Sequence, residues 1–178
     1  MYRFYSVGKN SHWKRSGMQK VSIFVDVQNV YYTTKQAHNS HFDYNAFWAK
    51  VTSNREVGKA VAYAIDRGDE KQKQFQNILR GIGFEVKLKP FIERRDGSAK
   101  GDWDVGITLD MIEHAKESDV VVLVSGDGDF DMLVQKAISV HGVIVEVYGV
   151  EALTAQSLIR SATTFVPIEG DLLLQPRN

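Results

Sequence analysis

Uninterrupted runs of apolar, largely β-branched residues are the feature that most constrains the fold of this chain. Such runs are typical of strands that are buried on both faces of a sheet. Polar and apolar residues alternate over 84–92, so a strand is predicted there with one face more polar than the other. A short strand is predicted over 164–168. The buried strands are predicted at 21–27, 59–65, 119–125 and 143–150.

Helical patterns separate these runs. Asp43 is predicted to cap a helix that contains Phe47, Trp48 and Val51. Residues 93–101 are polar and contain glycine, so a loop is expected there. Strands that alternate with helices form βαβ units, and hence a parallel sheet with helices on both faces. The expected fold is a three-layer α/β/α protein with a mainly parallel sheet of about five to six strands. Its later helices are predicted over 70–83, 102–117, 130–142 and 151–162.

The length of 178 residues is typical of one domain. We assign residues 20–169 to that domain, 1–19 to an N-terminal extension and 170–178 to a loosely held tail. The extension mixes basic with aromatic residues, a composition that also suits an arm on nucleic acid. We prefer the simpler interpretation, an extension outside the domain.

Composition excludes several classes of site. Lys plus Arg and Asp plus Glu both number 22, which argues against a simple polybasic nucleic-acid binder. The chain has no cysteine, so disulfides, thiol catalysis and cysteine-ligated zinc are excluded. No apolar run approaches the length of a membrane span, and the first residues lack the apolar core of a signal peptide. We therefore expect a cytoplasmic protein without a membrane partner.

Carboxylates gather where predicted strands end. Asp26 closes the first strand, and Asp127 follows the strand at 119–125. Ligands of open α/β sheets bind beyond the carboxyl ends of the strands. Several ionised carboxylates are costly to bring together without a cation, and hard oxygen ligands favour Mg²⁺ or Mn²⁺. The further acids at this predicted edge are Asp102, Asp104, Asp129 and Asp131.

Each of these further acids also has a purely structural interpretation. Asp129 suits the N-cap of the following helix. Asp131 is better explained as an acid of the first helical turn, or as a solvated side chain, than as a ligand. Asp102 suits the N-cap of its own helix, which would leave Asp104 as the inward residue.

Two known ligand-binding loops are excluded because the residues they require are missing at the required positions. An EF-hand that began at Asp127 would need glycine at 132 and glutamate at 138, where the chain has Met132 and Ile138. A dinucleotide-binding turn would need a third glycine at the position of Asp131, whose charge would repel a pyrophosphate. The five histidines show no spacing typical of metal ligands.

Three segments, FVDVQN, KGDWDVGITLDM and VLVSGDGDF, together resemble the NYN domain family, specifically its LabA-like branch within the PIN-like nuclease superfamily. The resemblance implies a PIN-like α/β/α fold and a metal-dependent ribonuclease. By motif position it implies Asp26, Asp104 and Asp127 as the acidic core. It also implies Asn29 as a catalytic residue and Asp129 as a further metal ligand.

The chain departs from the family pattern at two positions. Val27 stands where a glycine is commoner, which narrows access to the site. The segment KGDWD contains an extra residue, so either Asp102 is a further ligand or the loop bulges and only Asp104 reaches the site. We prefer Asp104.

The expected chemistry is hydrolysis of single-stranded RNA at this metal site. Asn29 would orient the attacking water or a phosphate oxygen. Lys100 would contact phosphate or separate the carboxylates as an ion-pair partner, while Arg94 and Arg95 would track the RNA backbone or only be solvated. Trp103 would stack on a base, or more simply pack under the loop.

Two alternative functions would give activities different from that of a ribonuclease. A non-catalytic RNA-binding or regulatory protein on the same fold would keep the acids for a structural ion. A phosphatase of the haloacid-dehalogenase type would need a second acid at 28, where the chain has Gln28. A homodimer through the strand at 143–150 and its helix is compatible with the sequence, which does not demand it.

Overall fold

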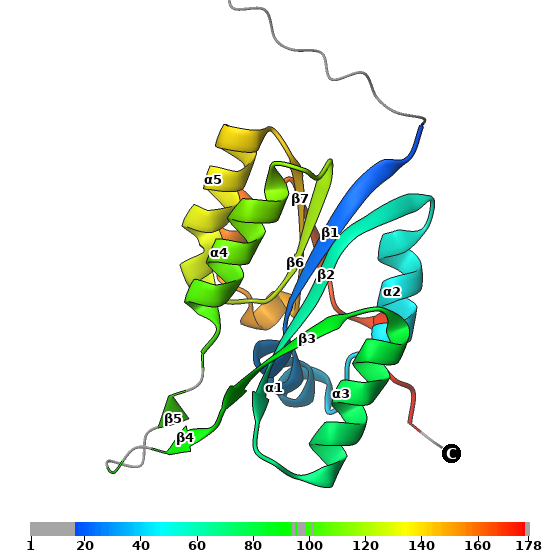
Figure 1. The fold of residues 1–178 in the computed structure, drawn as a ribbon, viewed down its shortest axis with the longest axis vertical. Coiled ribbons are helices and arrows are strands. Elements are labelled where there is room, and N and C mark those ends of the chain that lie inside the picture. The colour runs from blue at the N-terminus through cyan, green and yellow to red at the C-terminus, as the bar shows by residue number, and fades with distance from the viewer. Residues whose placement is uncertain (1–16, 94, 96–98, 101, 177–178) are drawn as a thin grey trace, which may run out of the picture.

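One six-stranded parallel sheet forms the centre of the molecule (Figure 1). The structure, a computed structural model, describes residues 17–93, 95, 99–100 and 102–176. The strands lie in the order β3-β2-β1-β6-β7-β8. Their bounds are β1 Gln19–Asp26, β2 Arg55–Asp66, β3 Glu85–Pro90, β6 Val120–Val124, β7 Ile144–Gly149 and β8 Thr164–Pro167.

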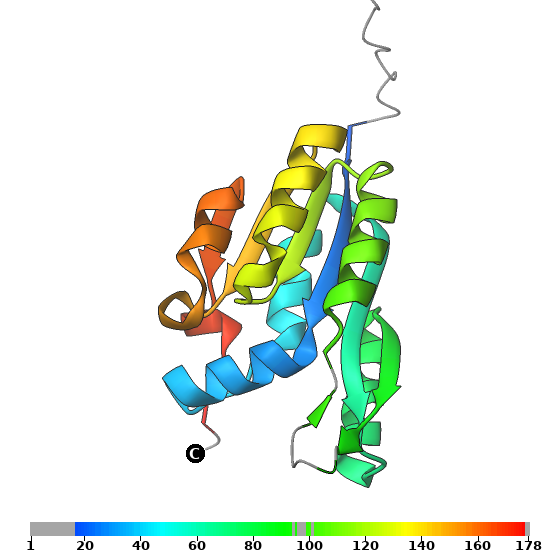
Figure 2. The same ribbon diagram turned by 90° about the vertical axis from the view of Figure 1, so that its left-hand side faces the viewer.

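Each face of the sheet is covered by helices from one half of the chain. Helices α1 (Val27–His38), α2 (Tyr44–Thr52) and α3 (Glu70–Ile82) pack on one face. The other face carries α4, α5 and α6 (Figures 1 and 2). This is the predicted three-layer α/β/α fold. The bounds of the second set are Asp104–Ala115, Asp131–His141 and Gln156–Ser161.

The two faces have separate apolar cores because side chains alternate along each strand. Ile23 and Val25 of β1 point toward the first set of helices, whereas Phe24 points toward the second. β6 is buried throughout, as expected for a central parallel strand. Among the described residues, none of the helices has the length and apolarity needed to cross a membrane.

The order of the strands places a topological switch between β1 and β6. The chain moves outward from β1 through β2 to β3, then returns to β6 and moves outward through β7 to β8. Helices leave the two central strands on opposite sides, and this arrangement opens a crevice at their carboxyl ends. Asp26 and Asp127 follow these two strands, which are paired as expected.

Helix α1 was not predicted. It starts directly after β1, because Asp26 is its N-cap and accepts a hydrogen bond from the backbone N of Asn29 at 3.4 Å. No turn residues separate strand from helix. Only Val30 and Thr34 are buried, so the segment lacks the wide apolar stripe by which a helix is recognised.

The predicted loop at 93–101 contains a short antiparallel ladder instead. β4 (Ile92–Glu93) pairs with β5 (Ala99–Lys100), and the strand expected over 84–92 ends at Pro90. A two-residue strand has no periodicity that a sequence pattern can reveal. The hairpin projects from the carboxyl edge of the sheet (Figure 1).

The predicted helix at 151–162 is broken into a 3₁₀ turn, Glu151–Leu153, and α6. Thr154 lies between them, is buried, and donates its hydroxyl to the carbonyl of Val150 at 2.7 Å. The strand at 143–150 is also no dimer edge, because β7 is paired with β6 on one side and β8 on the other.

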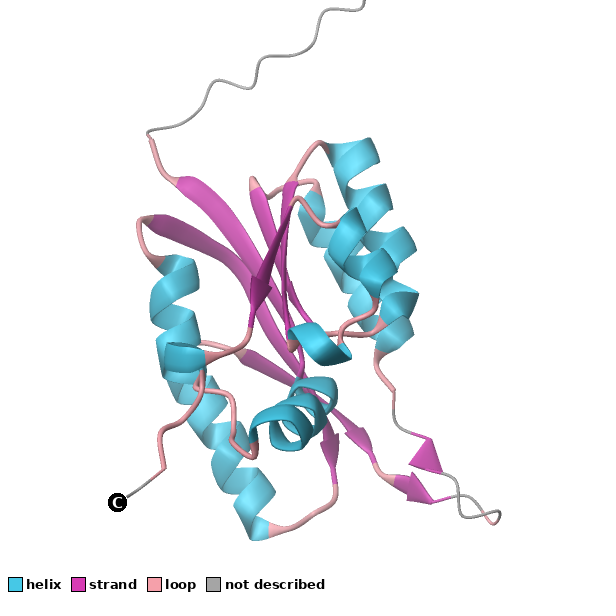
Figure 3. Cartoon of the chain, turned by 180° about the vertical axis from the view of Figure 1, so that it is seen from behind, coloured by secondary structure: helices cyan, strands magenta, loops and turns pink. Residues whose placement is uncertain are grey.

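The C-terminal segment is attached to the domain, so the expectation of a loosely held tail is wrong for residues 170–174. Leu172 is buried, and its carbonyl accepts a hydrogen bond from the backbone N of Asp43 at 2.8 Å. The backbone N of Leu174 donates to the carbonyl of His41 at 2.8 Å. Figure 3 shows this segment beside the helices of the first half of the chain.

Candidate metal centre

Three carboxylates converge at the carboxyl edge of the sheet. Asp104 is the first residue of α4, Asp127 follows β6, and Asp129 lies in the 3₁₀ turn Gly128–Phe130. Each offers one oxygen, and these three oxygens lie within 4.8 Å of one another. Ligand oxygens around an octahedral Mg²⁺ are at most about 4.2 Å apart, given bonds of about 2.1 Å. Small side-chain rotations would therefore bring all three oxygens onto one ion.

The electrostatics of Asp104 fit a cation at this position. Its pKa is raised from 3.8 to about 6, first by burial and then by the negative charges of Asp127, Asp102, Asp26 and Asp129. A divalent ion would reverse this effect, because it favours the ionised form of every carboxylate beside it. The donor set consists of oxygen alone, as Mg²⁺ and Mn²⁺ prefer.

Asp26 adjoins the three carboxylates but is held by hydrogen bonds. Its side chain accepts from the backbone N of Asn29, and from the hydroxyl of Ser125 at 3.2 Å. Burial raises its pKa to about 6, the two hydrogen bonds lower it, and the charges of Asp127 and Asp102 raise it. The structure thus brings Asp26 to the edge of the cluster, where it also caps α1.

Asn29 joins α1 to the turn after β6. Its side-chain oxygen accepts a hydrogen bond from the backbone N of Gly126 at 2.9 Å. The amide oxygen is therefore engaged within the protein, and the amide nitrogen is the group that Asn29 can offer to a substrate. This contact joins residues 97 apart in the sequence.

Ser125 is a site residue that the sequence analysis missed. It is fully buried, donates to Asp26, and accepts from the backbone N of Asp127 at 3.2 Å. Asp127 in turn accepts from the backbone N of Asp129 at 2.9 Å, so Asp127 caps this turn and Asp129 does not. A hydroxyl at the end of an otherwise apolar strand was the available signal.

The two glycines of this turn permit a close approach to the chain after β7. A Cβ atom at Gly126 would lie 2.9 Å from the carbonyl oxygen of Leu153. One at Gly128 would lie 2.8 Å from the Cβ of Ala155. The turn that carries Asp127 and Asp129 is therefore fixed on both sides, by Asn29 and by the segment before α6.

The other predicted acids lie apart from the three carboxylates. Asp102 is exposed, and Trp103 rather than Asp102 is the N-cap residue of α4. The side chain of Asp102 is not among the three, although its charge raises the pKa of Asp26 and Asp104. Asp131 is the first residue of α5, as its structural interpretation expects.

Two of the three predicted RNA-contacting residues belong to the described part of the chain, in or beside the hairpin. Lys100 belongs to β5, Arg95 is exposed, and Arg94 lies outside the described residues. Trp103 donates its Nε1 to the carbonyl of Ala64 at 2.8 Å, and Lys89 Nζ lies 4.4 Å from its ring centroid. Trp103 therefore packs against β2, which agrees with the simpler of its two interpretations.

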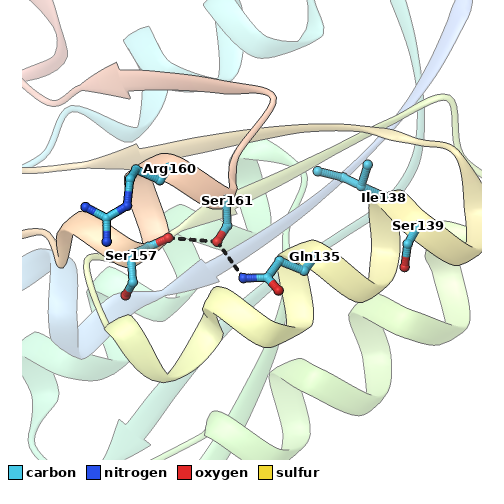
Figure 4. Close-up of a pocket in the computed structure, with 6 residues that line it drawn as sticks. All are labelled: Gln135, Ile138, Ser139, Ser157, Arg160 and Ser161. Atoms are coloured by element: carbon cyan, nitrogen blue, oxygen red, sulfur yellow. Dashed lines mark hydrogen bonds between the residues drawn. The ribbon is translucent and has the colours of Figure 1, made fainter.

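A cavity of about 460 Å³ between α5 and α6 is separate from these acids (Figure 4). Gln135 donates its amide to the hydroxyl of Ser161 at 3.1 Å, and Ser161 donates to the carbonyl of Ser157 at 2.7 Å. No carboxylate and none of the predicted site residues lines it.

Fold and site together define an α/β/α protein with a carboxylate cluster at the switch point of a parallel sheet, an arrangement suited to a divalent cation. The family model of the NYN domain matches residues 20–169. The chain therefore belongs to the NYN domain family, as its three motifs suggested.

Two known proteins are similar to the chain over most of its length. It is 27% identical over 143 residues to the low amplitude and bright protein LabA of Synechococcus elongatus, covering 75% of this chain and 76% of LabA. It is 57% identical to VPA0982, a protein of unknown function from Vibrio parahaemolyticus. That crystal structure superposes with a TM-score of 0.86 and covers 91% of this chain and 100% of its own.

Proposed function

We propose that this protein is a metal-dependent ribonuclease that hydrolyses phosphodiester bonds of single-stranded RNA. The observation that carries the proposal is the convergence of Asp104, Asp127 and Asp129 at the switch point of an NYN domain. A cytoplasmic location is part of the same proposal. Homodimerisation, if it extends the sheet, would use the outer strands β3 or β8.

In this proposal the three carboxylates hold Mg²⁺ or Mn²⁺. Such an ion supplies a water of lowered pKa and polarises the scissile phosphate. Ser125 holds Asp26 and the backbone of Asp127 in place, and Asn29 fixes the turn through Gly126.

Residues around the metal ion would act on the substrate through their positions and charges. The side-chain nitrogen of Asn29 donates to the attacking water or to a phosphate oxygen. Lys100, Arg94 and Arg95 neutralise the RNA backbone beside the site, as their positions in the sequence, within β5 or between β4 and β5, suggest. Asp26, already held by two hydrogen bonds, adds negative charge that strengthens cation binding.

The test is cleavage of an end-labelled single-stranded RNA with manganese, with magnesium and with chelator. We expect cleavage only with a metal ion. Asp127→Asn should reduce the rate by at least about 100-fold, because it removes a ligand charge but keeps the shape. Asp131→Asn is the matched control, since Asp131 opens the next helix outside the cluster, and it should cut like the wild type.

The alternative function is a non-catalytic RNA-binding or regulatory protein. It is favoured by the position of Asp26, whose hydrogen bonds give it a structural role without any metal ion. Under this alternative, the wild type would bind RNA but leave it intact with every ion. Asp127→Asn would then hardly change RNA affinity, whereas Arg95→Ala would weaken it.

A further inference from the structure

A groove lies between α1 and α3, on the opposite face of the sheet from α4. Its volume is about 730 Å³, and it is lined by aromatic, amide and basic side chains. Val27 and Gln28, the two residues directly after Asp26, form part of its wall. The groove therefore begins at the carboxyl edge that carries the acids, beside α1, which Figure 2 shows crossing this edge.

Its outer wall presents aromatic rings to solvent. Tyr31 and Tyr32 are 43% and 50% exposed, although both are large rings on a structured helix. Their centroids lie 5.4 Å apart at an interplanar angle of 77°, and His41 is stacked on Tyr31 at 5.5 Å. Since Tyr31 already stacks on His41, Tyr32 is the ring available to a planar ligand. Bases of single-stranded RNA bind by stacking on rings of this kind.

Its inner wall contains an amide side chain that opens into the groove. Gln76 is only 5% exposed, and its side chain makes no hydrogen bond to any other described residue. It nevertheless lines the groove. No buried side-chain N or O atom of the described residues lacks a hydrogen-bond partner, so the amide of Gln76 is open to the groove, where it offers both a donor and an acceptor to a ligand. The edge of a nucleobase offers that combination.

Charge around the groove also favours an anionic ligand. Arg67 and Lys71 line it and are exposed. Asp69 lines it too, but its carboxylate accepts a hydrogen bond from the backbone N of Gln72 at 2.8 Å as the cap of α3. Two cations are therefore available to a phosphate, and the one lining carboxylate is engaged within the protein.

The groove and the acidic cluster are also coupled electrostatically. Tyr44 lines the groove, and its pKa is raised first by burial and then by the negative charge of Asp26. Asp26 directly precedes Val27 and Gln28, which line the groove, and the charge of Asp127 contributes to the raised pKa of Asp26. A strand of RNA can thus occupy both by passing over the first turn of α1.

We propose that the α1–α3 groove binds a base of single-stranded RNA that flanks the phosphodiester bond at the acidic cluster. The base stacks on Tyr32, its edge meets the amide of Gln76, and Arg67 and Lys71 contact its phosphates. This inference rests on the proposed function for the identity of the substrate. It adds a specificity site, because an amide that reads a base edge distinguishes one base from another.

Equilibrium binding of a fluorescent single-stranded RNA tests the groove without cleavage. Binding is measured in magnesium with the Asp127→Asn protein as background, so that the RNA stays intact. Adding Tyr32→Ala should weaken binding roughly fivefold or more, the loss expected for one base stack. Tyr32→Phe keeps the ring and should bind normally, and Gln76→Leu should reduce the difference in affinity among oligonucleotides of different base composition.

A charge-matched pair of variants separates the groove from general electrostatics. Lys71→Ala changes a residue that lines the groove and should weaken RNA binding more than Lys116→Ala does. Lys116 is the exposed C-cap residue of α4, at the opposite end of that helix from Asp104. Thermal unfolding of each variant verifies the fold. Ultraviolet crosslinks to the RNA should map to the peptide that contains Tyr31 and Tyr32.

The outcomes separate this inference from the proposed function. If Tyr32→Ala and Gln76→Leu bind RNA as the background protein does, or if no RNA is bound at all, the proposed role of the groove is wrong. Metal-dependent cleavage is then still judged on the wild type. A wild type that never cuts RNA, with binding still weakened by Tyr32→Ala, supports the groove and overturns the nuclease.

Discussion

Individual carboxylates at the carboxyl edge of the sheet have structural roles and also lie at the candidate metal centre. Asp26 caps a helix and Asp127 caps a turn, yet both lie among like charges in a partly buried crevice. Caps are ordinarily exposed, where their charge costs little. At Asp26, where burial raises the pKa, an ionised carboxylate lowers stability, which is the pattern expected of a functional site.

The pH dependence of stability should reveal this cost at Asp26. Its pKa is raised from 3.8 to about 6, so the folded protein binds more protons than the unfolded chain between these values. The contribution of Asp26 to stability is therefore greatest below about pH 4 and is lost as the pH rises through 6. Two pKa units correspond to about 3 kcal/mol.

In chelator at pH 7, Asp26→Asn should accordingly raise the free energy of unfolding, by up to about 3 kcal/mol. The new amide oxygen can replace only one of the two carboxylate oxygens: it can accept from the backbone N of Asn29 in place of Oδ1, while the amide nitrogen, in place of Oδ2, would donate to the hydroxyl of Ser125. Urea denaturation of both proteins at pH 4 and pH 7 measures the effect, which should nearly vanish at pH 4. A variant less stable than the wild type at pH 7 would contradict this account.

Gly126 supplies a test of the close approach that fixes the turn. In Gly126→Ala, the new methyl group would meet the carbonyl of Leu153 at 2.9 Å, and unfolding should become easier by about 1–3 kcal/mol. Gly81→Ala is the control, because a Cβ there meets nothing within 4 Å and should stabilise α3 by roughly 0.5 kcal/mol. Denaturant midpoints of the two variants should therefore shift in opposite directions.

At this scale the sequence predicted that acids gather at the carboxyl edge, but not which of them come together or which residues they contact. Residues at the carboxyl ends of neighbouring parallel strands meet at one edge of the sheet, and this holds for Asp26 and Asp127. The contacts of Ser125 with Asp26 and of Asn29 with Gly126 depend on side-chain directions across residues far apart in sequence. Such contacts become visible only when the strands are placed. The roles of these residues in metal binding and catalysis stay predictions.

Elements whose apolar residues form a continuous run or a regular period were predicted well. Elements defined by capping or by tertiary contacts were not. β6 is apolar throughout and needs no context to be recognised. α1 buries only two side chains and is fixed by its cap and by Asn29, while the C-terminal segment bonds to the loop after the helix at His41 and Asp43. Its sequence, rich in β-branched and aromatic residues, favours strand as much as helix.

A bidentate ion pair joins elements from the two halves of the chain. Arg55, at the start of β2, donates from both Nη atoms to Glu146 of β7, at 3.0 and 2.8 Å. The side chains are 20% and 15% exposed, so neither partner is well solvated alone. The hydrogen bond to Glu146 is the first cause of the raised pKa of Arg55.

Arg55→Met should therefore lower the free energy of unfolding by about 2 kcal/mol, since it leaves Glu146 partly buried and unpaired. Adding Glu146→Leu should restore much of this loss, because both charges are then gone. Lys73→Met breaks an exposed pair with Glu70 and should change stability by less than about 1 kcal/mol. If Arg55→Met behaved like Lys73→Met, the pair would have no role in joining the halves.

For the molecule as a whole, the last described residues complete the packing around α1. Leu172 is buried, Leu173 pairs with Phe42, and Leu174 bonds to His41 and lines the α1–α3 groove. Deleting residues 170–178 should cost about 2–4 kcal/mol, mainly from the lost burial of leucine side chains. Chemical denaturation gives the value, and an unchanged midpoint would show that the segment is dispensable.

The separation of the two helix layers by chain half has a consequence for how the molecule can be divided. β1 to β3 with α1 to α3 form one half, and β6 to β8 with α4 to α6 form the other. Asp26 belongs to the first half, whereas Asp104, Asp127 and Asp129 belong to the second. A chain cut between 93 and 99 would yield two fragments with a parallel three-stranded sheet each, and only their reassociation would restore the complete crevice. If the two fragments reassociate, proteins fused to each of them would report their encounter through the crevice that the fragments rebuild.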